Sequence, residues 1–143
     1  MIDQVNVFLE NEKGRLASLC ATLAATGIDM HALMVADTSD FGIVRIVCDD
    51  PCAAAGALGE AGYRARLAPV AAVEVPGRPG GLAELLSFLD DCDIDVEYLY
   101  CFAHPAPGHD ASVAVMKLSS DRDVAAELAR AGFHELAPAD LYA

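Results

Sequence analysis

Hydrophobic and polar positions alternate at the start of the chain and then change to a helical period. Val5, Val7 and Leu9 recur at every second residue, as on a strand with one buried face. Over residues 14–26 the apolar side chains recur three and four residues apart, as on a helix with one buried stripe. That stripe consists of Leu16, Leu19, Cys20 and Leu23. The pattern predicts a strand followed by an amphipathic helix that ends at Gly27.

The rest of the first half predicts a hairpin, a second helix and a last strand. Residues 28–37 and 41–49 are strand-like and are joined by a polar turn. Asp50 and Pro51 suit the cap and first turn of a helix, which Gly62 follows, and residues 63–70 form a further strand. The order strand, helix, strand, strand, helix, strand is typical of a ferredoxin-like αβ sandwich. In that fold an antiparallel sheet carries both helices on one face.

The second half of the chain repeats the first. A shift of 66 residues carries Gly14 onto Gly80, and a shift of 70 carries Gly62 onto Gly132. The repeated elements are expected at residues 71–75, 80–91, 93–103, 111–118, 121–131 and 133–136. We therefore predict two α+β repeats, residues 1–70 and 71–143. The tail from Pro138 is too short for an element of its own.

Composition narrows the choice of partners. Hydrophobic residues make up 55% of the chain, yet no apolar run approaches the roughly 20 residues of a membrane span. The 22 acidic and 9 basic residues give a formal charge of −13, and we find no cluster of basic residues in the sequence that offsets it. We expect no nucleic-acid or membrane partner. The start of the chain does not resemble a signal peptide, which predicts a cytoplasmic location.

The five cysteines are odd in number and form no C-x-x-C pair. We expect reduced thiols that pack as small hydrophobic side chains. Cys101, His104, His109 and Asp110 match a zinc site poorly, so we predict an exposed loop there and no metal.

The loop before the first helix carries the most suggestive chemistry. Gly14 stands where the helix begins, and the free N–H groups of a first helical turn favour a carboxylate. Asn11 adds a side chain that both donates and accepts hydrogen bonds. Together they suit an amino acid, which presents a carboxylate and an ammonium group. The alternative is that both residues only shape the turn, and the spacing alone does not decide between the two.

The run from Val7 to Leu16, with the helix and Gly27-Ile-Asp-Met30 after it, resembles the opening of an ACT domain. This is a small-molecule regulatory module of amino-acid biosynthetic enzymes such as phosphoglycerate dehydrogenase and aspartokinase. Its usual pattern is Asn/Asp-x-Pro-Gly-x-Leu; the first copy has Lys13 in place of the proline, and the second keeps Pro79 but lacks the Asn. Segments 40–45, 98–103 and 139–142 resemble, more narrowly, stand-alone bacterial tandem ACT proteins that have no catalytic domain.

This resemblance implies two modules side by side in one eight-stranded antiparallel sheet, with helices on one face and an amino acid in the cleft between the modules. The better site would join the first helix-start loop to the strand after the second copy's first helix. Its residues would be Glu10, Asn11, Gly14, Arg15, Leu16, Asp95, Glu97 and Tyr98. A weaker site would consist of Gly77, Arg78, Gly80, Asp29 and His31. Pro76 and Pro79 weaken the second site because proline has no N–H group.

We therefore predict a non-enzymatic amino-acid-binding regulatory protein without a cofactor, since the sequence has none of the common catalytic motifs. The acidic and aromatic residues of the better site favour a ligand with a polar or basic side chain, such as histidine. The alternative is an interaction or oligomerisation module for a separately encoded metabolic enzyme, with a vestigial ligand site. A homodimer of the two-repeat molecule is compatible with either function.

Overall fold

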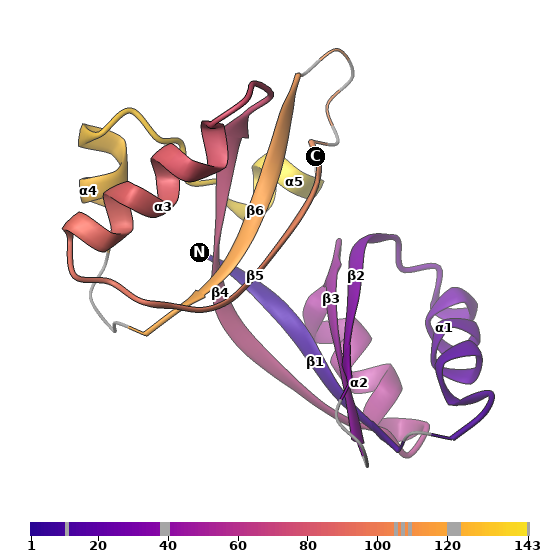
Figure 1. The fold of residues 1–143 in the computed structure, drawn as a ribbon. Coiled ribbons are helices and arrows are strands. Elements are labelled where there is room, and N and C mark those ends of the chain that lie inside the picture. The colour runs from indigo at the N-terminus through magenta and orange to yellow at the C-terminus, as the bar shows by residue number, and fades with distance from the viewer. Residues whose placement is uncertain are drawn as a thin grey trace. The chain divides into compact units, whose positions relative to one another are not determined.

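The computed structural model describes residues 1–10, 12–37, 41–104, 106, 108, 110–119 and 124–142. It divides into two compact units. The first unit is Asp3–Ala68; the second is Pro69–Ala143 together with Met1–Ile2. Figure 1 shows the course of the chain through its helices and strands. The repeat boundaries given above, 1–70 and 71–143, stay a prediction.

The first unit follows the order of elements predicted for the first copy. Its elements are β1 (Ile2–Glu10), α1 (Arg15–Thr26), β2 (Met30–Asp37), β3 (Phe41–Cys48), α2 (Pro51–Glu60) and the first part of β4 (Arg64–Pro76). The strand order is β2-β3-β1-β4, and β3 is antiparallel to both β1 and β2. This is the strand order of a ferredoxin-like unit.

The core of the first unit lies between one face of its sheet and both helices. Val5, Val7 and Leu9 of β1 pack with Leu19 and Leu23 of α1, as the alternation and the helical stripe predict. The rest of this core comprises Val44, Ile46, Cys48, Ala54, Leu58 and Tyr63. Phe8 and Glu10 alternate with these β1 core residues and therefore belong to the opposite face of the sheet.

Both helices begin and end as their sequences predict. Gly14 precedes α1 with φ 86°, a left-handed conformation that glycine adopts without strain. Asp50 caps α2: its carboxylate accepts a hydrogen bond from the Ala53 N–H at 3.0 Å, and Pro51 takes the first turn. α1, with 12 residues, is the longest helix of the described chain, and no helix there is long and apolar enough to cross a bilayer.

The second unit repeats this plan with a shorter second helix. It contains the rest of β4, α3 (Gly81–Asp91), β5 (Val96–Ala103), β6 (Ala111–Leu118), α4 (Ala125–Arg130) and α5 (Pro138–Tyr142). The strand order is β4-β6-β5, and β6 is antiparallel to both neighbours. Leu85 and Leu89 of α3 and Leu128 of α4 are buried against Val73 and Met116 of the sheet.

The prediction of eight strands is wrong for the described residues, where six are found. Predicted strands 63–70 and 71–75 are one continuous strand, β4, because no turn interrupts the extended chain between them. The predicted strand 133–136 forms only an isolated bridge between Val73 and Glu135. The tail also differs from its prediction: it forms α5, where Asp140 accepts from the Ala137 N–H at 2.8 Å and Leu141 is buried.

The cysteines are free thiols with unequal exposure. Cys48 is buried in the first core, and burial raises the pKa of its thiol to about 11. Cys20 and Cys92 are half-buried against the two cores, which agrees with their prediction as small hydrophobic side chains. That prediction is wrong for Cys52 and Cys101, which are exposed.

Candidate functional site

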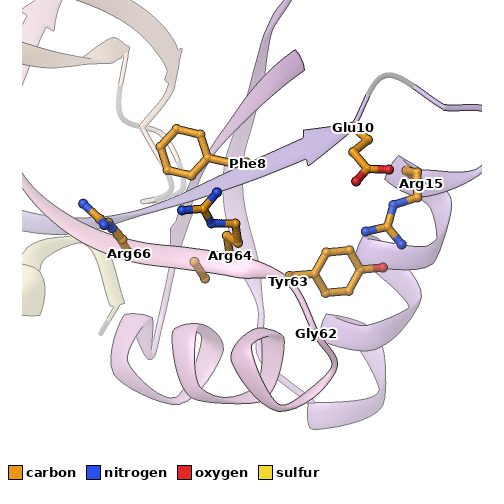
Figure 2. A pocket seen from close by; sticks show the side chains of 8 residues that line it. Phe8, Glu10, Arg15, Gly62, Tyr63, Arg64 and Arg66 are labelled. Carbon is orange, nitrogen blue, oxygen red and sulfur yellow. The ribbon is translucent and has the colours of Figure 1, made fainter. Parts of the chain in front are cut away.

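The first unit contains a pocket of about 670 Å³ beside the start of α1. The end of β1, the first residue of α1 and the turn between α2 and β4 surround it (Figure 2). Its lining residues are Phe8, Glu10, Arg15, Gly62, Tyr63, Arg64, Ala65 and Arg66. The volume lies in the range of roughly 300–1,000 Å³ that is typical of small-molecule sites.

The turn after α2 places three of these side chains. Gly62 has φ 92°, and the Tyr63 N–H donates to the Leu58 carbonyl at 2.9 Å, which directs the chain from the helix into β4. Tyr63 points into the core and is 7% exposed. Because side chains alternate along a strand, Arg64 and Arg66 share the opposite face, with Cα atoms about 7 Å apart. Figure 2 shows both arginines on the same side of the sheet as Phe8.

Arg15 is held against an aromatic ring. Its guanidinium carbon lies 4.9 Å from the centroid of the Tyr63 ring, within the range of a cation–π contact. The Tyr63 hydroxyl donates to Ser18 Oγ at 2.7 Å, which fixes the ring. The Nε atom of Arg15 is buried and has no hydrogen-bond partner among the described residues. A buried donor without a partner is unfavourable, so the position of this side chain costs free energy that the contact with the Tyr63 ring helps to offset.

The pocket is positively charged in an acidic chain. Arg15, Arg64 and Arg66 against Glu10 give a net charge of +2, whereas the chain carries −13. The expectation that no basic cluster exists is therefore wrong. The fold brings Arg15 to the same pocket as Arg64 and Arg66, which lie about 50 residues later in the sequence. A search for basic residues that are neighbours in the sequence does not find such a cluster. The sequence does contain one indication: Arg64 and Arg66 are two residues apart in a predicted strand, so their side chains share one face.

A second pocket, of about 560 Å³, lies at the corresponding point of the second unit. Glu74 and Pro76 replace Phe8 and Glu10 at the shift of 66 residues. The glycine, aromatic and basic residues of the turn are replaced, at the shift of 70, by Gly132, Phe133 and His134. The two copies therefore keep a pocket at the same place.

The charges of the second pocket are different. Arg78 donates two hydrogen bonds to Glu84, at 2.7 and 2.8 Å, and these hold the pKa of Glu84 below its usual value. With Glu74 and Asp110 the pocket carries −2 when His134 is neutral. The Arg78 guanidinium is thus already bound by the Glu84 carboxylate of the protein itself.

The structure brings some of the predicted residues of the better site together. Glu10 and Arg15 line the first pocket, and Figure 2 shows the Glu10 carboxylate turned toward the Arg15 guanidinium. Gly14 adopts the left-handed conformation directly before Arg15, and Leu16 is 39% exposed in the next position of the helix. Asn11 lies outside the described residues.

The other residues of the better site belong to the second unit. Asp95 and Glu97 are exposed and Tyr98 is half-buried, all three at or just before the start of β5. The Asp95 N–H donates to Ser119 Oγ at 3.2 Å, which ties this segment to the end of β6. Their association with the helix-start loop of the first unit stays a prediction.

The weaker site is also divided between the two units. Gly80 repeats the left-handed conformation of Gly14, and Arg78 lines the second pocket. Gly77 lies so close to Asp110 that an added Cβ would be 2.6 Å from the carboxylate. Asp29 and His31 lie at the start of β2, where the Asp29 N–H donates to the Asp49 carboxylate at 3.2 Å. The association of these two groups likewise stays a prediction.

No three His, Cys, Asp or Glu side chains gather as metal ligands within the part of the chain that the structure describes. His109, one of the residues weighed for zinc above, lies outside that part.

The fold and the two pockets define a class: a duplicated ferredoxin-like protein in which each copy has a pocket beside its helix-start loop. The family model of the ACT domain pair matches residues 1–118, and the chain belongs to this family. The resemblance of the two helix-start loops to ACT domains is thereby confirmed. No curated protein matches the chain.

Solved structures support the same fold. Protein BT0572 from Bacteroides thetaiotaomicron is 33% identical, with 98% of this chain and 94% of that chain covered and a TM-score of 0.88. The regulatory subunit of aspartate kinase from Thermus thermophilus is 20% identical, with 90% and 86% covered and a TM-score of 0.61. The alpha and beta subunits of an aspartokinase are 15% identical, with 80% of each chain covered and a TM-score of 0.58. The last two are similar in fold alone.

Proposed function

We propose that this protein is a non-catalytic regulatory protein that binds a free amino acid in the pocket of its first unit. The observation that carries the proposal is the pair of opposite charges at one end of that pocket, Glu10 and Arg15. A carboxylate suits the ammonium group of an amino acid, and a guanidinium suits its carboxylate. Membership in a family of ACT domain pairs supports a regulatory role.

Arg15 is the residue on which binding depends most in this proposal. Its stacking on Tyr63 holds the guanidinium in place before the ligand arrives, so little side-chain freedom is lost on binding. The ligand carboxylate accepts from the N–H groups of this guanidinium. Regulation then follows from differential affinity, because a ligand that prefers one conformation of the protein increases its population.

Isothermal titration calorimetry with each of the twenty proteinogenic amino acids tests the proposal. We expect saturable heat with at least one of them and an affinity about 10-fold or more weaker for Arg15→Gln. Arg130→Gln is the matched control, since it removes the same charge from an exposed position on α4. No heat and an unchanged melting temperature with all twenty amino acids would rule the function out.

The alternative is an interaction module whose ligand site is vestigial. Leu33 and Val35 favour it, because they are 37% and 45% exposed on β2, an edge strand that presents apolar side chains. This function predicts that Val35→Asp abolishes association with a partner or a second copy while Arg15→Gln leaves it intact. Sedimentation velocity of both variants separates the two functions.

A further inference from the structure

Two arginines of the first pocket have no role in binding the amino and carboxylate groups of an amino acid. Arg64 and Arg66 are exposed and form no salt bridge or hydrogen bond with another described residue. They project from the same face of β4, at the end of the pocket where Figure 2 also shows Phe8. Two cations side by side on one face of a strand repel each other, so this end of the pocket favours a bound anion.

The chemistry of these side chains selects an anion. A guanidinium forms paired, parallel hydrogen bonds with a carboxylate or a phosphate. With Cα atoms about 7 Å apart on one face, the two arginines can approach one anionic group from both sides or bind two neighbouring groups. Phe8, which is 41% exposed, offers an apolar surface to the carbon skeleton that connects these groups to the rest of a ligand.

The balance of charge points the same way. A zwitterionic amino acid with a neutral side chain satisfies Glu10 and Arg15 but leaves the pocket at +2. A ligand with one more anionic group reduces this charge and gives Arg64 and Arg66 a partner. Because the chain as a whole carries −13, an anion is attracted only where basic groups gather locally.

The second unit shows that the arginines are not required by the fold. At the shift of 70 residues, His134 stands in place of Arg64, and the buried Leu136 stands in place of Arg66. The second pocket keeps the same position with a charge of −2. The two arginines are therefore a property of the first pocket alone, as a ligand-specific feature should be.

We propose that the ligand of the first pocket is a small molecule with a second anionic group, a carboxylate or a phosphate, which Arg64 and Arg66 bind. This inference rests on the proposed function for the choice of the first pocket, and it adds to that function the chemical class of the ligand. The choice of an acidic ligand differs from the histidine that the sequence suggests, because the three arginines of the folded pocket outnumber its single glutamate.

Calorimetry with matched pairs of probes tests this inference. Glutamate and aspartate are compared with glutamine and asparagine, which have the same shape without the second charge. Inorganic phosphate, pyrophosphate and O-phosphoserine form the phosphate arm. We expect at least one acidic probe to bind about 10-fold or more tightly than its neutral counterpart, or a phosphate probe to bind in its own right. This binding is expected to weaken as salt concentration rises.

The double variant Arg64→Gln/Arg66→Gln assigns the effect to the two arginines. We expect it to abolish the preference for the anionic probe, while Arg130→Gln retains it; circular dichroism checks that each variant is folded. If only inorganic phosphate and pyrophosphate bind, the inference stands and the amino-acid function fails. If neutral amino acids bind as well as acidic ones and the double variant binds them unchanged, the inference fails and the amino-acid function stands. If no probe binds, both fail.

Discussion

The pockets of the two units lie at corresponding positions of the same fold and differ in almost every charged side chain. The first has three arginines and one glutamate, and the second has one arginine among three carboxylates. Yet the backbone is closely repeated: the glycines before α1 and α3 have φ 86° in both copies. The repeat preserves the elements that form the core and leaves the pocket free to diverge.

Two of the substitutions concern Arg15 and its surroundings. Gly81 stands in place of Arg15, and an added Cβ there would lie 2.6 Å from the Pro76 carbonyl oxygen, so the second unit has no room for an arginine. Glu84 stands in place of Ser18, and it binds Arg78, whereas Ser18 holds the ring on which Arg15 stacks. One guanidinium is thus open to a ligand, and the other is neutralised within the protein.

The largest effect is expected from introducing a side chain at Gly81. Gly81→Ala should lower the free energy of unfolding by about 3 kcal/mol, because the new Cβ displaces the backbone at Pro76. The corresponding change in the first unit, Arg15→Ala, removes a cation–π contact and should cost only about 0.5–1 kcal/mol. Urea denaturation of both variants measures the difference. Equal losses would mean that the two helix starts tolerate side chains alike.

The ends of α1 and α3 provide a smaller contrast. Gly27 has φ 76°, and its counterpart Asp93 has φ 59° without being a glycine. Gly27→Ala should therefore destabilise the protein by about 1–2 kcal/mol. Asp93→Gly relieves the same strain and should raise the melting temperature or leave it unchanged. A clear loss of stability in Asp93→Gly would show that its side chain stabilises the turn more than its backbone strains it.

Tyr63 and Phe133 test how much the first pocket depends on one hydroxyl. Tyr63→Phe, which copies the second unit, removes the hydrogen bond to Ser18 and should cost about 1 kcal/mol. Phe133→Tyr adds a hydroxyl where Glu84, already bound by Arg78, stands in place of that serine, so we expect it to gain less than Tyr63→Phe loses. Thermal unfolding of the two variants checks this. Tyr63→Phe should also loosen Arg15, which calorimetry detects as weaker binding of the same probe.

The smallest effect concerns pH. The pKa of Glu84 is lowered by its hydrogen bonds from Arg78, so the pair stabilises the protein above the ordinary glutamate pKa and stops doing so as pH falls through the lowered one. Wild type and Glu84→Gln should therefore differ slightly in melting temperature at neutral pH and converge in acid. Carboxylate titration followed by NMR reports the Glu84 pKa directly. A Glu84 pKa at its usual value would contradict this pairing in solution.

The sequence patterns predict the fold more completely than the site. Alternation in β1 and the stripe in α1 identify the core, because each depends on neighbours only a few residues away. The patterns do not predict that β4 continues across the boundary between the two repeats. An apolar run gives no sign of whether a turn interrupts the strand there or the chain stays extended. The arginine cluster is missed for a different reason: Arg15 meets Arg64 and Arg66 only through the folding of the unit. The resemblance to the ACT family does predict Glu10 and Arg15, because it includes the loop that carries them.

Gly81 has a consequence for how the two copies can evolve. A single base change converts a glycine codon into an arginine codon, so the second unit is one mutation away from carrying the residue that stands at position 15 in the first. The carbonyl of Pro76, 2.6 Å from the Cβ that such a residue would bring, makes that mutant unstable unless the backbone shifts first. The change from glycine to arginine at position 81 is thus a single step in the gene, but the close Pro76 carbonyl opposes it in the folded protein.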